Sequence, residues 1–107
     1  MPREKFQTLT EQMFYILLCL RKECCGMDIM AEVSEITEGR VSVGPGTLYN
    51  LLEQFVQAGM IRETKVEGRR RSYLITKDGL DMLEKEYKRI KAQTEDYCRF
   101  MEKEMHR

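Results

Sequence analysis

The chain has 107 residues, the size of one domain, and 34% of them are charged, with a formal net charge of zero. No apolar run approaches the roughly 20 residues that span a bilayer, which excludes an integral membrane protein, and the neutral balance excludes a uniformly basic protein that coats nucleic acid. The N-terminal stretch MPREKF has no apolar signal-peptide core, so we expect a cytoplasmic protein whose four cysteines are reduced.

A first helix is predicted from Leu9 to Glu23. Thr8 and Glu11 have the Ser/Thr-x-x-Glu spacing of a capping box, which satisfies free amide groups at a helix start. Phe14 and Leu18 lie off the main apolar face, so the helix is apolar over more of its circumference than one small core requires. The main face repeats at helical spacing and consists of Leu9, Met13, Ile16, Leu17 and Leu20.

Two further helices are predicted close together, from Met27 to Thr37 and from Pro45 to Ala58. Gly44 is kept from helical geometry by the proline that follows it, while Pro45 suits a first helical position. Because the link between the two helices is short, the pair is predicted to form a helix-turn-helix. Their buried faces are predicted to consist of Ile29, Val33 and Ile36, and of Leu48, Leu51, Leu52, Phe55 and Val56.

Two short strands are predicted next, from Met60 to Val66 and from Arg71 to Ile75, because both runs are rich in β-branched and aromatic residues. Residues 61–79 contain six Lys or Arg and three Asp or Glu, a net charge of +3. Residues 1–60 contain five Lys or Arg and eight Asp or Glu, a net charge of −3. A helix followed by a basic hairpin is typical of a winged helix-turn-helix. The basic residues either contact phosphate or form a solvated turn.

A last helix is predicted to begin after Thr76, whose hydroxyl can cap it. Its apolar residues alternate steps of three and four, as in a coiled-coil seam, for three heptads. At about 1.5 Å per residue the helix would be about 42 Å long, far longer than the core that precedes it. Rather than folding back on its own domain, it is expected to pair with its mate in a homodimer and to cover Phe14 and Leu18. The seam comprises Leu80, Leu83, Tyr87, Ile90, Thr94, Tyr97 and Met101.

The fold class predicted is therefore mainly α with a small β-hairpin: a winged helix-turn-helix followed by a long C-terminal dimerisation helix. Residues 1–76 are expected to form the DNA-binding domain and residues 77–107 the dimerisation helix, as one structural unit.

The segment VGPGTLYNLLEQFVQAGMI, followed by GRRRSYLITKDG, resembles the PadR family of bacterial transcriptional regulators. The likeness extends from Leu9 through the last helix, and the single terminal helix is similar to the short branch of that family. The resemblance implies a homodimeric repressor that places each third helix in a major groove of a pseudo-palindromic operator. It also implies that a ligand at the dimer interface releases the double-stranded DNA.

The resemblance also implies roles for residues in the third helix and the wing. Thr47 and Tyr49 match family positions that hold backbone phosphates, although Tyr49 could instead pack at the edge of the core. Asn50 and Gln57 project outward, where a carboxamide either recognises adenine or is simply solvated. The wing residues expected to hold phosphate or enter the minor groove are Arg69, Arg70 and Arg71.

One feature departs from the family pattern. Family members often carry Lys or Arg in the recognition helix, whereas this helix has neither and carries Glu53 instead. Electrostatic affinity for DNA would then rest on the wing.

A small hydrophobic effector is a further implication of the resemblance, because flat apolar ligands sit between the terminal helices of related short regulators, often against a tryptophan. This chain has no tryptophan. Tyr87 and Ile90 occupy the corresponding stretch, where they either line an aromatic ligand or only pack in the seam.

No cofactor, metal site or catalytic constellation is predicted. Cys24 and Cys25 are adjacent and could hold a soft ion or sense redox state, but no Cys-x-x-Cys or histidine cluster supplies a zinc site, and His106 is the lone histidine. An enzyme is therefore not expected. The alternative from another class is a dimeric winged-helix adaptor that binds a protein instead of DNA.

Overall fold

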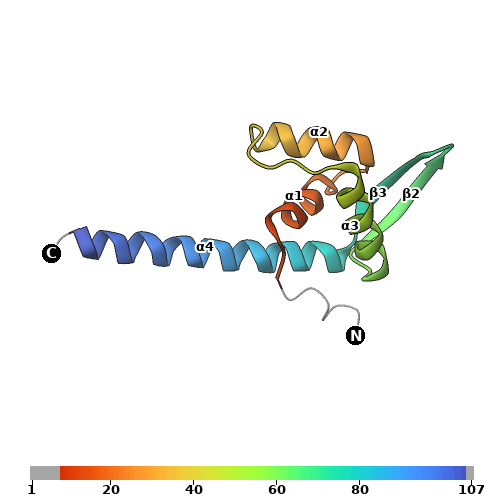
Figure 1. Ribbon diagram of the computed structural model, residues 1–107. Coiled ribbons are helices and arrows are strands. Elements are labelled where there is room, and N and C mark those ends of the chain that lie inside the picture. Colours follow the sequence, from red (N-terminus) through yellow and green to blue (C-terminus); the bar gives the residue numbers. More distant parts are fainter. Residues whose placement is uncertain (1–7, 106–107) are drawn as a thin grey trace.

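The computed structural model describes residues 8–105, with side chains to residue 103, as four helices and a three-stranded antiparallel sheet (Figure 1). Figure 1 shows α1, α2, α3 and the sheet gathered at one end, while the last helix projects beyond them. None of the described helices combines the length and hydropathy that a membrane crossing requires. In chain order the elements are α1 (Glu11–Cys19), β1 (Cys24–Cys25), α2 (Gly26–Ile36), α3 (Pro45–Gln57), β2 (Ile61–Glu67), β3 (Arg70–Ile75) and α4 (Lys77–Met105).

Helix α1 is shorter at both ends than its periodicity predicts. Its N-cap is Thr10, whose hydroxyl accepts a hydrogen bond from the Met13 amide at 3.2 Å, so the predicted cap at Thr8 is wrong. The helix ends early because the chain after it joins the sheet, where the Ile75 amide donates to the Leu20 carbonyl at 2.8 Å. The apolar spacing of a helix continues in the sequence beyond Cys19, but the hydrogen bond to β3 ends the helix there.

The core lies where the buried faces of α1, α2 and α3 meet the base of the sheet. Phe55, Ile16 and Leu20 are fully enclosed at its centre, as the apolar spacing predicts. Two residues assigned to these faces are in fact exposed: Ile36 by 46% and Val56 by 40%. Ile36 ends α2, and the next residue, Thr37, is buried in its place. Val56 lies on the side of α3 that faces the hairpin, where the sheet does not cover it.

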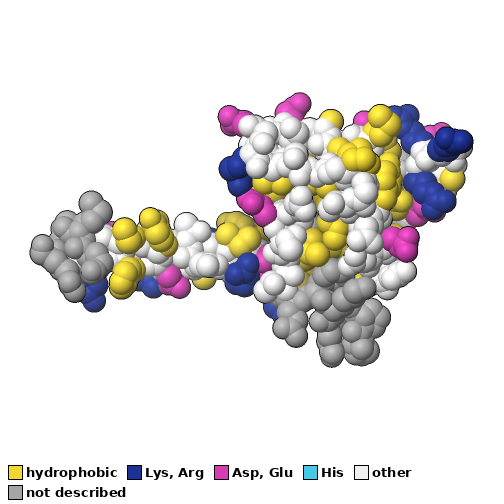
Figure 2. All heavy atoms as spheres, viewed as in Figure 1, with side chains coloured by type: hydrophobic (Ala, Val, Ile, Leu, Met, Phe, Trp, Pro, Cys, Tyr) yellow, Lys and Arg dark blue, Asp and Glu magenta, His cyan; other side chains and the backbone are white. Residues whose placement is uncertain are grey.

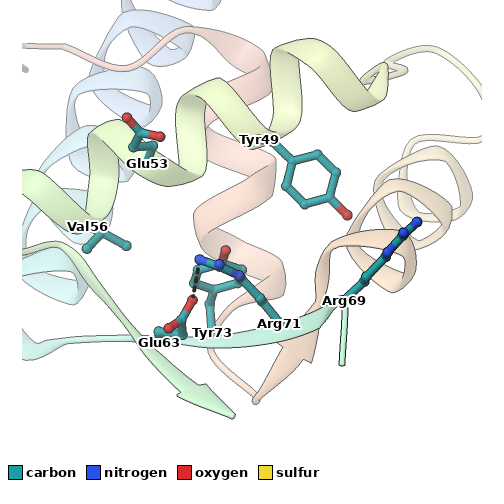
Figure 3. Close-up of a pocket in the computed structure, with 7 residues that line it drawn as sticks. All are labelled: Tyr49, Glu53, Val56, Glu63, Arg69, Arg71 and Tyr73. Carbon is teal, nitrogen blue, oxygen red and sulfur yellow. Dashed lines mark hydrogen bonds and ion pairs between the residues drawn. The ribbon is translucent and has the colours of Figure 1, made fainter. Parts of the chain in front are cut away.

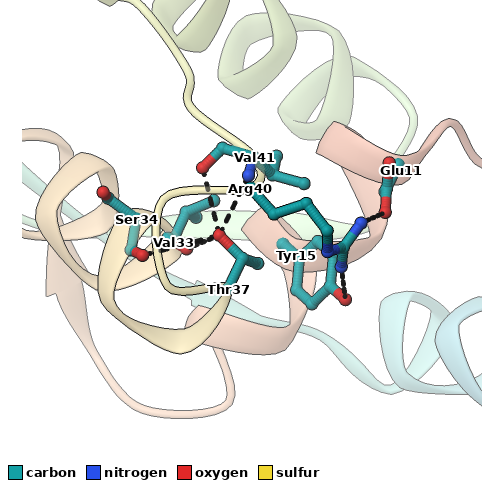
Figure 4. Close-up of polar contacts among 7 residues, drawn as sticks. All are labelled: Glu11, Tyr15, Val33, Ser34, Thr37, Arg40 and Val41. Atoms are coloured by element: carbon teal, nitrogen blue, oxygen red, sulfur yellow. Dashed lines mark hydrogen bonds and ion pairs between the residues drawn. The ribbon is translucent and has the colours of Figure 1, made fainter.

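Polar contacts fix the turn between α2 and α3 (Figure 4). The buried Thr37 hydroxyl donates to the Val33 carbonyl at 2.8 Å and accepts from the Val41 amide at 3.1 Å, which closes the end of α2 against the following loop. The Arg40 guanidinium binds Glu11 and donates to the Tyr15 hydroxyl at 3.0 Å, so the same loop is tied to α1. These contacts fix the loop that leads from α2 into α3.

The sheet contains a strand that the periodicity does not predict. Cys24 and Cys25 form β1, which pairs with Tyr73 and Ser72 of β3. Strands β2 and β3 form the hairpin predicted as the wing, with Gly68 at its tip in the left-handed region (φ 65°). Glycine adopts this conformation without steric cost. The structure therefore confirms the winged helix-turn-helix, with a sheet of three strands rather than a hairpin alone.

Helix α4 is anchored to the domain by its first turns. The Thr76 hydroxyl accepts from the Gly79 amide at 3.2 Å and donates to the Gly59 carbonyl at 2.7 Å, so the predicted cap also holds the end of α3. A side chain at Gly79 would place its Cβ 2.1 Å from the Met60 carbonyl oxygen, so only glycine permits this approach. The 29 residues of α4 extend about 43 Å at about 1.5 Å per residue.

A buried carboxylate joins α4 to the segment that precedes α1. Glu86 is only 2% exposed and accepts from the Leu9 amide at 3.2 Å. The Arg89 guanidinium donates to it at 3.1 and 2.5 Å. The hydrogen bonds from Arg89, helped by that from Leu9, hold the Glu86 pKa below its ordinary value of 4.5 despite burial.

We expect Glu86→Gln to lower the free energy of unfolding by about 2 kcal/mol at pH 7, because a neutral amide weakens two charge-assisted contacts in a buried site. A carboxyl with a depressed folded pKa stabilises the protein above its unfolded pKa, and this contribution disappears as the pH falls through the folded pKa. The difference between wild type and variant in thermal unfolding should therefore be present at pH 7 and shrink below about pH 4. Glu95→Gln, on the exposed part of α4, is the matched control, and an equal loss in both variants would contradict this role of Glu86.

Candidate nucleic-acid interface

Helix α3 presents a polar face opposite the core. At about 100° per residue, Asn50, Glu53 and Gln57 lie opposite the buried Leu48 and Leu52. The exposed Thr47 lies at one edge of this face and Tyr49, 46% exposed, at the other. Four of the predicted DNA contacts, Thr47, Tyr49, Asn50 and Gln57, are thus exposed on one helix surface.

An open groove of about 500 Å³ lies between α3 and the wing (Figure 3). Tyr49 enters it from α3, while Arg69 and Arg71 enter from the wing. Arg71 is paired with Glu63 of β2, with 3.3 Å between Nη1 and Oε2. The groove is lined by Tyr49, Glu53, Val56, Glu63, Arg69, Arg71 and Tyr73.

Four groove residues were not predicted as site residues from the sequence: Glu53, Val56, Glu63 and Tyr73. Burial, followed by the nearby Glu63 carboxylate, raises the pKa of the Tyr73 phenol, so its hydroxyl remains a neutral hydrogen-bond donor at neutral pH. Glu63 stands opposite Tyr73 in the hairpin, and Arg71 lies two residues before Tyr73 on the same strand, so the ion pair is a diagonal contact between neighbouring strands.

A smaller cleft of about 230 Å³ adjoins this groove between the start of α2 and the wing. Tyr49, which borders both, lies over Gly26: a Cβ at Gly26 would be 2.5 Å from the Tyr49 hydroxyl oxygen and 2.8 Å from the ring. Arg70 lies beside Cys25 and Asp28, which raise its pKa. The cleft therefore brings Tyr49 together with all three wing arginines. The role of Gly26 in admitting the ring is visible only in three dimensions.

Basic side chains dominate the wing and apolar ones follow α4. Figure 2 shows the dark-blue Lys and Arg side chains gathered over the hairpin at the right, and yellow side chains along the projecting helix. Arg69, Arg70 and Arg71 are exposed and can reach an anionic surface, although Arg71 is paired with Glu63 within the chain.

The predicted dimerisation residues form an apolar surface along α1 and α4. Phe14 and Leu18 of α1 border an open groove of about 600 Å³ together with Leu80, Leu83 and Tyr87 of α4. Leu83 is buried in the core of its own chain. The rest of the seam is exposed: Leu80, Tyr87, Ile90, Thr94, Tyr97 and Met101.

The two candidate effector residues reach the surface beside α1. Tyr87 and Ile90 border a second groove, of about 320 Å³, with Leu9, Phe14 and Tyr15. Farther along α4, Phe100 is 66% exposed and was missed because it stands outside the heptad seam.

Cys24 and Cys25 do not present their thiols together as a pair that could hold one ion. Successive side chains of a strand point to opposite faces, so these two thiols of β1 diverge. Burial raises the pKa of Cys24 to about 11 and that of Cys19 to about 12, so both are protonated thiols near neutral pH. Among the side chains of residues 8–103 no three from His, Cys, Asp or Glu are placed to hold a metal ion.

Comparison with known proteins identifies the family. Residues 16–85 match the model of the transcriptional regulator PadR-like family. No curated protein sequence matches the chain. Among solved structures, a transcriptional regulator from Clostridium thermocellum is similar with a TM-score of 0.71 at 18% identity, over 84% of this chain and 91% of that one. A PadR family transcriptional regulator from Eggerthella lenta gives a TM-score of 0.63 at 22% identity, over 84% and 77%.

A PadR-like transcription factor from Bacteroides fragilis has a TM-score of 0.67 at 26% identity, over 81% of this chain and 86% of that one. The structural likenesses confirm the winged-helix fold. The family model spans well over half of the chain, and the family regulates transcription and is not enzymatic, as predicted here. This protein therefore belongs to the PadR-like family of transcriptional regulators.

Proposed function

We propose that this regulator is a homodimeric, cytoplasmic repressor that binds a pseudo-palindromic operator through α3 and the wing. The observation that carries the proposal is the exposed polar face of α3 beside three exposed arginines. A helix of this kind fits the major groove, and guanidinium groups at its flank fit phosphate. Thr47 and Tyr49, at the edges of the face, would hold phosphates, while Asn50 and Gln57 would face base edges.

The apolar surface of α4 supports a two-fold dimer. Tyr87 is 52%, Tyr97 65% and Met101 41% exposed, an unusual number of large apolar side chains along one helix in water. Pairing of this seam with the same seam of a second chain, and with Phe14 and Leu18, would cover these side chains. In this arrangement residues 1–76 bind DNA and residues 77–107 dimerise the chain.

We assign the effector site to the grooves beside Tyr87 and Ile90. These residues belong to the dimer seam, so a small aromatic ligand bound there would change the distance between the two winged domains. Two α3 helices fit adjacent major grooves only at one separation, and a ligand that alters it would release the DNA.

Gly26→Ala is expected to weaken DNA binding about tenfold, because the added Cβ displaces Tyr49 and its phosphate contact is lost. Alanine in a first helical turn should leave the thermal stability nearly unchanged. The check is a double-mutant cycle with Tyr49→Ala, measured by DNA-binding anisotropy. If Gly26 acts through Tyr49, Gly26→Ala should have no further effect in the Tyr49→Ala background; additive losses would show another cause.

Fluorescence anisotropy of labelled duplexes from upstream of the protein's own gene, at several salt concentrations and against scrambled duplexes, tests the proposal. We expect tight, sequence-selective binding with a slope of log K against log salt of roughly −5, from about three phosphate contacts per subunit. Weak binding that does not distinguish the duplexes would instead favour a winged-helix adaptor that binds a protein.

A further inference from the structure

Glu53 is the one charged residue among the thirteen residues of α3. It is exposed on the outward face, beside Asn50 and Gln57 and on the side towards the wing, where it lines the groove between α3 and the wing. Figure 3 shows its carboxylate turned away from the paired Glu63 and Arg71. Arg71 is engaged by Glu63, and no described side chain, from residue 8 to residue 103, forms a salt bridge with Glu53.

An unpaired carboxylate on a helix in the major groove of DNA can accept hydrogen bonds only from the few donor groups that the bases present there. It repels phosphates, and it repels the acceptor atoms of guanine and thymine in the major groove. Adenine offers an amino group, but its N7 acceptor lies beside it. Cytosine presents the N4 amino donor and no acceptor on its own major-groove edge, so it matches a carboxylate best.

We propose that Glu53 is a specificity-determining residue that accepts a hydrogen bond from the N4 amino group of a cytosine in each operator half-site. The inference rests on the proposed function and deepens it, because it assigns a base to one position of α3. The wing supplies attraction to any duplex, whereas Glu53 penalises every duplex that lacks a donor at its position. Glu53 therefore lowers the affinity for DNA in general and increases the difference in affinity between the operator and other sequences.

The test is in vitro selection of duplexes from a random pool, with wild type and Glu53→Gln in parallel. Wild type should select a half-site with one position occupied by C·G, preferred about tenfold or more over other pairs in binding titrations. Glu53→Gln should change that position to A·T, because a carboxamide matches adenine, and should leave the other positions as they were. It should also bind scrambled duplexes severalfold more tightly, since one negative charge per subunit is removed.

Glu35→Gln on α2 removes the same charge away from the outward face of α3 and should select the wild-type sequence. If Glu53→Gln selects the same sequence as wild type, the assignment of Glu53 is overturned while DNA binding stands. If wild type enriches no sequence and binds no duplex, the proposed function fails, and this inference with it.

Discussion

Conversion of Arg69, Arg70 and Arg71 to Glu is expected to abolish DNA binding, with a loss of affinity of at least about a thousandfold at moderate salt. The three residues concentrate exposed positive charge on the wing, and α3 has no cation that could replace them. A dimer would lose about six phosphate contacts and gain repulsion at the same places. The salt dependence of any residual binding should collapse from a slope of roughly −5 towards zero.

Anisotropy titrations against the operator duplex measure this loss. The matched control converts Lys85, Lys88 and Arg99, exposed on α4, to Glu and changes the total charge equally. The control should bind with nearly wild-type affinity, because exposed charges farther than about 10 Å from the DNA are screened at 0.1 M salt. Equal affinity for the wing variant and the wild type would contradict the role of the wing.

The second large effect is expected from the double substitution Tyr87→Glu and Ile90→Glu. Two carboxylates from each chain would meet at the centre of the seam, where desolvation and repulsion oppose association. The chain should then sediment with the mass of one 12.7 kDa subunit rather than two. Operator affinity should fall by about a thousandfold, because the second half-site is no longer tethered to the first.

Sedimentation velocity and anisotropy on the same samples separate the two steps. Lys85→Glu with Lys88→Glu, on the outward side of α4, is the control and should remain dimeric. If the Tyr87 and Ile90 variant remains dimeric, the seam is not the interface. If it is monomeric yet binds the operator as tightly as wild type, binding does not need two half-sites.

The parts of the fold that were predicted correctly have strong local signals. Pro45 marks the start of α3 and Thr76 caps α4, as these residue types do in many helices. The wing is marked by strand-forming residues on either side of Gly68. Each of these signals lies within a few residues of the structure it determines.

The parts that were missed depend on contacts between distant segments. Strand β1 has only two residues, too few for any alternation, and it exists because Tyr73 and Ser72 pair with it. The helical pattern of α1 continues past Leu20, but the chain leaves it to bond with Ile75.

In the candidate site, too, the features with a local signal could be predicted and those that depend on distant segments could not. The wing arginines and the outward residues of α3 could be identified from charge and helical spacing, and they are exposed as expected. The close approach of Gly26 to Tyr49 and the pairing of Glu63 with Arg71 could not, because they require the angle between α2, α3 and the wing.

Hydroxyl-radical footprinting of the wild-type protein on its selected duplex tests the central proposal most directly. A dimer that places two α3 helices in successive major grooves should protect two half-sites about 10 base pairs apart, related by two-fold symmetry, with further protection where each wing meets the backbone. A single asymmetric footprint, or none at concentrations that saturate anisotropy, would contradict it.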